Sequence, residues 1–168
     1  MTATVAFAQR GKHPAPPPPL AVIARVTSAK KIFLSNAGAD NYFVNDIPGG
    51  ADVSYNELYA SLKQWGYFQL VDSLAQADLI FEIRGTETCD WNQRGNITRD
   101  HYVQVCSAFM LNLSILGPST QGLLYKIVLA AGRAGNIPKG KIAFAKSIDA
   151  LTAQVKALVA APALSQNP

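Results

Sequence analysis

Cysteine, histidine and acidic residues gather in one stretch of the chain, where they could bind a metal ion. They are Cys89, Asp90, His101 and Cys106. Zinc sites favour ligand pairs at short spacing, such as C-x2-C or H-x3-H, and neither pair occurs here. An even number of cysteines in an exported protein indicates a disulfide, whereas in a cytosolic protein these two would be unrelated thiols. We expect a Cys89–Cys106 disulfide, no metal and no other cofactor.

The same stretch holds side chains that could act as acids and bases. Beside His101 they are the carboxylates of Glu82, Glu87, Asp90 and Asp100. Nucleophilic and glycosidic chemistry both need such groups to meet in space. The chain has no G-x-S-x-G turn, and a surface histidine at the start of a strand is the simpler interpretation of His101. We expect no enzymatic activity, and a small hydrolase that uses these groups is the alternative.

Residues 85–100 are polar, and we expect them to form a loop. Aromatic and arginine side chains are enriched at the energetic centres of protein interfaces. In and beside the expected loop these residue types are Trp91, Arg94, Arg99 and Tyr102. We therefore predict an interaction patch there. The alternative is that Trp91 folds back and covers the edge of a sheet.

Hydrophobic periodicity indicates where the helices and strands lie. Strands are expected at residues 31–35, 67–71, 79–84, 103–115 and 123–130, and amphipathic helices at 54–65 and 145–158. The pattern Ser54-Tyr-Asn-Glu57 is typical of a capping box at the start of the first helix, and Gly66 supplies its left-handed end. This order of elements predicts an α+β two-layer sandwich, with a five-stranded mixed sheet and two main amphipathic helices on one face.

The composition favours one globular domain. About half of the residues are hydrophobic (49%) and 15% are charged, which argues against extensive disorder. We expect a disordered, proline-rich segment at 1–29, one domain at 30–160 and a flexible end at 161–168. The net charge is +4, but the basic residues are scattered, so we expect no nucleic-acid partner.

The first residues suggest export. Ala6-Phe7-Ala8 has the small-x-small form of a signal-peptidase site, and the segment before it is mostly apolar. We interpret this as the end of a truncated secretion signal, and an ordinary flexible N-terminus is the alternative. The chain has no run of apolar residues long enough to span a membrane. We therefore expect a periplasmic or secreted protein.

A resemblance supports this location. The block YNELYASLKQWGYFQLVDSLAQADLIFEIRG, followed by LNLSILGPSTQGLLYKIV and a terminal amphipathic helix, resembles uncharacterised exported proteins of soil bacteria. Its layout is similar to small α/β modules of the bacterial envelope, such as the TolB N-terminal domain and outer-membrane accessory lipoproteins. Ala77-Asp78 matches the turn of such modules, whereas Gly117-Pro118 replaces an Asp-Pro in their later hairpin. The resemblance covers about residues 30–160 and implies an accessory domain without enzymatic activity.

Three functions therefore remain open. The first is a non-enzymatic, exported domain that contacts an unknown envelope protein or component through its sheet edge or the 85–101 region. The second is a binder of a small lipid or other hydrophobic molecule between the last helix and the sheet. The third is the small hydrolase.

Overall fold

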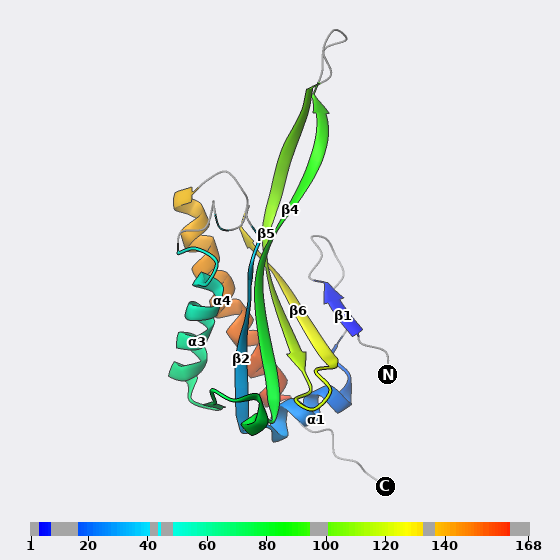
Figure 1. Cartoon of the computed structure of the whole chain (residues 1–168), viewed down its shortest axis with the longest axis vertical. Helices are drawn as coiled ribbons and strands as arrows, with labels where there is room; N and C mark the ends of the chain where they lie inside the picture. The colour runs from blue at the N-terminus through cyan, green and yellow to red at the C-terminus, as the bar shows by residue number, and fades with distance from the viewer. Residues whose placement is uncertain are drawn as a thin grey trace.

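The chain folds as an α+β structure in which helices pack on a six-stranded mixed sheet (Figure 1). The computed structural model describes residues 4–7, 17–40, 44, 49–94, 101–132 and 137–161, and of residues 4–7, 88–94, 101–108, 132 and 137–143 it describes the backbone alone. In order across the sheet, the strands are β1 (Thr4–Phe7), β6 (Leu123–Gly132), β5 (His101–Leu116), β4 (Leu79–Arg94), β2 (Lys31–Ala39) and β3 (Gln69–Leu70). The helices are α1 (Leu20–Ser28), α3 (Val53–Trp65) and α4 (Ile137–Ala160), with a 3-10 turn η1 (Leu74–Gln76).

The pairing of the strands confirms the predicted mixed sheet. Strand β2 pairs in parallel with both β3 and β4, as a helical crossover through α3 requires. Strands β4, β5 and β6 are antiparallel neighbours, and β1 adds a parallel strand to the outer side of β6. All five expected strands are present, and β1 is the sixth. No helix in the described parts of the chain is long and apolar enough to cross a membrane.

Two of these elements lie within the segment 1–29, where we expected a disordered tail. Strand β1 pairs with residues of β6 from Tyr125 to Val128, so the backbone groups on that side of β6 have hydrogen-bond partners. Helix α1 begins directly after the prolines and buries Val22 and Val26, which are four residues apart and so share one face. The expectation of disorder is therefore wrong for these residues.

The expected polar loop at 85–100 is also wrong for most of its length. Strand β4 continues to Arg94, and β5 begins at His101 and pairs with it over their whole length. Polar side chains do not prevent this pairing, because the two backbones satisfy each other's hydrogen-bonding groups whatever the side chains are. Residues 95–100, which include Asp100, lie outside the described residues.

One face of the sheet packs against the helices and forms the core. Its register places Leu34, Phe81, Leu113 and Ile127 on the same side of four adjacent strands, and all four are buried. Helices α1, α3 and α4 supply the facing residues Val22, Val26, Leu58, Leu62, Leu151 and Val155. The opposite face carries the polar row Ser35, Glu82, Ser114 and Lys126. Glu82 thus lies on this polar face, and within the described structure it forms no ion pair.

The ends of α3 show one confirmed and one wrong prediction. Gly66 ends the helix in the left-handed conformation (φ 70°) that favours glycine. The capping box does not form, because the helix begins earlier, at Val53, and Ser54 is buried within the first turn. The oxygen of its hydroxyl is buried without a hydrogen-bond partner among the described residues. The preceding Asp52 accepts a hydrogen bond from the side chain of Asn36 (2.7 Å) and so ties the start of α3 to β2.

Candidate functional site

The most prominent surface feature is the outer part of the β4–β5 hairpin. Strand β2 pairs with β4 only as far as Gly85, and β6 pairs with β5 only as far as Phe109. Beyond these points, within the described residues, β4 and β5 pair only with each other, from Thr88–Ala108 to Arg94–His101. We call residues 88–94 and 101–108 the arm. It extends about 20 Å along the strands and projects from the body of the molecule (Figure 1).

The base of the arm is held to the body by polar contacts. The carboxylate of Asp40 accepts a hydrogen bond from the backbone N–H of Glu87 (2.8 Å), and the Asp40 N–H donates to the carbonyl of Gly85 (3.2 Å). On the neighbouring strand, the side-chain amide of Asn112 donates to the hydroxyl of Thr86 (2.9 Å). Phe109 is buried at this level in a cluster with Phe144 of α4. The arm therefore grows from a fixed base.

Three of the four residues predicted to form an interaction patch lie on the arm. Trp91 pairs with Gln104 in the register, and Arg94 pairs with His101. Tyr102 stands opposite Gln93, so the three residues fall within four successive register positions. Arg99 lies outside the described residues. That the patch binds a partner remains a prediction.

The two cysteines occupy directly opposite positions, Cys89 on β4 and Cys106 on β5. Opposite residues in antiparallel strands have Cα atoms about 4.5–5.5 Å apart, within the range that a disulfide spans. The register shifts between Thr88 and Cys89, which identifies a β-bulge at this point of the arm. The sheet register thus permits the bond, and the bond itself remains a prediction.

The same register separates the residues proposed for chemistry. His101 stands opposite Arg94, twelve positions along β4 from Glu82, which corresponds to about 40 Å. The cysteine pair is five positions from His101, or about 17 Å. Four ligands spread in this way cannot share one ion, and the described carboxylates do not meet His101. No group of three or more potential metal ligands occurs among the residues whose side chains are described.

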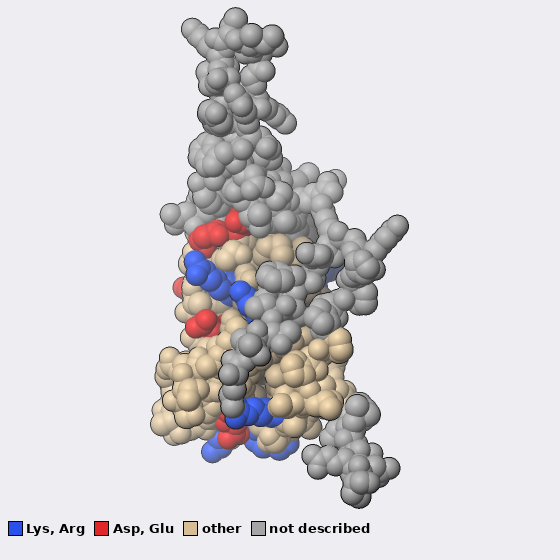
Figure 2. All heavy atoms as spheres, turned by 90° about the vertical axis from the view of Figure 1, so that its right-hand side faces the viewer, with Lys and Arg blue, Asp and Glu red and all other residues tan. Residues whose placement is uncertain are grey.

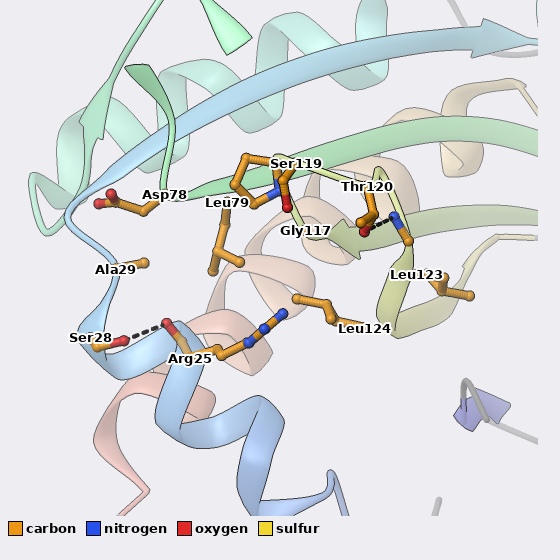
Figure 3. A pocket seen from close by; sticks show the side chains of 12 residues that line it. Arg25, Ser28, Ala29, Asp78, Leu79, Gly117, Ser119, Thr120, Leu123 and Leu124 are labelled. Atoms are coloured by element: carbon orange, nitrogen blue, oxygen red, sulfur yellow. Dashed lines mark hydrogen bonds between the residues drawn. The ribbon is translucent and has the colours of Figure 1, made fainter. Parts of the chain in front are cut away.

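A pocket of about 730 Å³ opens at the other end of the sheet, between the end of α1, the start of β4 and the β5–β6 turn (Figure 3). Arg25 extends into it, and its Nη1 lies 3.7 Å from where a Cβ atom of Gly117 would be. Within the described structure the guanidinium forms no ion pair, and the hydroxyls of Ser119 and Thr120 stand nearby. These groups could hold a carboxylate or phosphate oxygen. Arg25 is exposed to water, however, and Asp78 is the one acidic residue in the described lining of the pocket.

Asp78, on the far side of this pocket, has a structural role. Its carboxylate accepts hydrogen bonds from the backbone N–H groups of Lys30 and Lys31, both at 2.8 Å. These bonds, assisted by the charge of Lys31, lower the pKa of Asp78 although desolvation opposes them. Asp78 thereby joins the chain that enters β2 to the chain that enters β4. This explains the Ala-Asp turn noted in the sequence.

The charged side chains do not form a field of one sign on the side of β1 and β6. Figure 2 shows the described basic and acidic residues there as small neighbouring groups among uncharged ones. Binding to nucleic acid requires clustered positive charge, which this view does not show.

We predict that Asp78→Asn lowers the free energy of unfolding by roughly 1–2 kcal/mol at pH 7, because the amide replaces a charged acceptor of two hydrogen bonds. A group whose pKa is lowered on folding stabilises the protein above its ordinary pKa, and that stabilisation is lost as the pH falls through the lowered pKa. The difference from wild type should therefore shrink as the pH falls below 3.8, the ordinary pKa of this group, and disappear below the lowered pKa. Urea unfolding at several pH values measures it.

Asp72→Asn is the matched control, since Asp72 is an exposed residue of the same turn. It should change the stability by less than about 0.5 kcal/mol. Equal effects of the two substitutions would contradict the role assigned to Asp78.

We predict that the exported chain carries one Cys89–Cys106 bond, which closes a loop of about 17 residues and contributes roughly 3 kcal/mol in the chain-entropy model. Alkylation of the unfolded, unreduced protein should add no label, and two labels should appear after reduction. Mass spectrometry distinguishes these states. Two labels on the unreduced chain would exclude the bond.

Comparison with known proteins finds similarity in structure alone. No family model and no curated protein matches the sequence. Protein XCC0632 from Xanthomonas campestris, of the DUF330 family, is 12% identical over 92% of each chain, with a TM-score of 0.47. A homolog of the neuraminyllactose-binding hemagglutinin from Helicobacter pylori is 11% identical over 83% of this chain and 88% of its own, with a TM-score of 0.43.

The similar structures also include lipoprotein GNA1162 from Neisseria meningitidis, which is 10% identical over 76% of this chain and 98% of its own, with a TM-score of 0.36. TM-scores below 0.5 carry no argument about what this chain binds.

Proposed function

We propose that the chain is a non-enzymatic, exported module of the bacterial envelope that binds a partner protein through its arm. The observation that carries this proposal is the extension of β4 and β5 beyond both neighbouring strands.

The backbone of the arm favours a protein partner. A two-stranded ribbon on its own is at best marginally stable in water, so a long one gains from a surface that covers it. Beyond Gly85 and Phe109 no described strand lies beside β4 or β5, and the N–H and C=O groups on their outer sides can pair with an added strand. Such pairing supplies affinity through the backbone.

The residue types on the arm favour the same interpretation. Trp91, Arg94 and Tyr102 belong to the types that dominate binding energy when an interface buries them. They fall within four successive register positions near the outer end, where a partner would reach them first. The contacts at the base of the arm would hold this end in a defined position for binding.

The absence of enzymatic activity is supported by the spread of the reactive groups. Separations of about 17 and 40 Å along the ribbon keep the described cysteines and Glu82 away from His101. Export is supported by the register of the two cysteines, since a bond between them would persist in an oxidising compartment. The second candidate function is the binding of a hydrophobic molecule, and the observation that favours it is an apolar pocket between α4 and β6.

Site-specific photo-cross-linking tests the proposal. A benzoylphenylalanine replaces Trp91 or Tyr102 on the arm in the bacterium that encodes the chain, and Lys63 on the exposed surface of α3 is the matched control. We expect both arm positions to give one discrete adduct, because they would lie in the interface, and Lys63 to give none. Mass spectrometry of the adduct identifies the partner and shows whether it is a second copy.

Two results would contradict the proposal. One is the lack of any adduct from either arm position while the protein is folded and exported. The other is the same adduct at equal yield from Lys63, since the contact would then not involve the arm.

A further inference from the structure

A pocket of about 370 Å³ lies between the C-terminal half of α4, the helix-facing side of β6 and the residues that lead into α1. Its apolar walls include Pro17, Pro18, Ile23, Ile127 and Leu158. We expected the proline-rich segment to be disordered, but two of its prolines line this pocket. Their rigid backbone runs directly into α1, because the carbonyl of Pro19 accepts the first hydrogen bonds of that helix.

Tyr125 is the polar group that distinguishes this pocket. It lines the pocket from β6, and 6% of its surface is exposed. Its hydroxyl forms no hydrogen bond with a described residue, and its oxygen is not fully shielded from solvent, so a bound molecule could supply the partner. Burial raises the pKa of Tyr125, so the hydroxyl stays protonated and can donate a hydrogen bond. Gln154 of α4 adds a second polar side chain to the lining.

The lining also indicates what the pocket would exclude. None of the described residues that line it is a lysine, arginine, aspartate or glutamate. A carboxylate or phosphate placed there would lose its hydration without gaining an opposite charge, which is unfavourable. An apolar pocket with few polar groups is typical of sites for small organic ligands, and its volume lies near the lower end of their range.

We propose that this pocket binds a single-chain, lipid-like molecule with an uncharged head group that hydrogen-bonds to Tyr125. The hydrocarbon chain would lie along the apolar walls formed by the prolines, β6 and α4. The site is separate from the arm, and this proposal does not rest on the partner proposed there. Failure of either would leave the other standing.

The test uses 1-decanol as the probe and isothermal titration calorimetry of the full chain as the measurement. Ala157→Trp blocks the pocket, because Ala157 lines it from an exposed position on α4. Ala153→Trp is the matched control, one turn earlier on the same helix, where the exposed alanine faces the groove with α3. Thermal melts establish that both variants fold.

We expect saturable binding of one decanol to the wild type and to Ala153→Trp, and at least a tenfold loss of affinity in Ala157→Trp. Tyr125→Phe removes only the hydroxyl and should weaken decanol about fivefold, the effect of one ordinary hydrogen bond. Decanoate should bind more weakly than decanol at neutral pH, because its charge finds no partner.

Each contrary result has a definite meaning. No saturable binding of decanol to the wild type, or equal affinity of the two tryptophan variants, would overturn the site. Unchanged affinity in Tyr125→Phe would overturn the role of the hydroxyl. Tighter binding of decanoate than of decanol would overturn the uncharged head group.

Discussion

The backbone ladder between β4 and β5 is the constraint on which the rest of the structure depends. Fifteen residue pairs join the two strands, from Ile80–Leu116 to Arg94–His101. In its lower half the ladder lies in the middle of the sheet, where β2 and β6 flank it and α3 and α4 cover one face. In the arm, no described strand lies beside it. One continuous ribbon is therefore both the centre of the core and the projecting arm.

This division follows from the side chains. Phe81, Ile83, Leu111 and Leu113 are fully buried in the lower half, so packing on the helices holds the strands there. From Thr88–Ala108 outward the backbone pairing continues beyond the described ends of the neighbouring strands. The polar contacts of Asp40 with Gly85 and Glu87 mark the change, because they fix the ribbon where it leaves the body. At the opposite end, Asp78 joins β2 to β4 in the same manner.

The sequence predicted those elements whose side chains repeat with a clear period. Alternation over 103–115 identified the inner part of β5, and helical spacing together with Gly66 identified α3. The outer part of β4 could not be predicted, because its polar residues show no apolar period. Helix α1 escaped detection because it is short and follows a run of prolines, and its support comes from contacts with α4, far away in the sequence.

The candidate sites, like the helices and strands, could be predicted from the sequence only in part. The residue types of Trp91, Arg94 and Tyr102 were enough to predict an interaction patch. Their place on a pair of extended strands could not be predicted, because the polar sequence gives no sign that β4 and β5 pair there. The pocket at Tyr125 brings together residues 17–23, β6 and α4, so no local pattern could indicate it. Ser54 shows the opposite failure, in which a local capping pattern is overridden by a helix that starts earlier and buries the hydroxyl.

Hydrogen–deuterium exchange of the isolated chain tests most directly whether the body supports only the lower half of the ribbon. Amides of residues 80–85 and 109–116 should exchange slowly, near the rate of global unfolding, because they lie in the packed sheet. Amides of residues 88–94 and 101–107 should exchange at least about a hundredfold faster, because a ribbon without neighbours opens locally. Equally slow exchange along the whole hairpin would show that the arm is already covered within the chain, and would contradict this account.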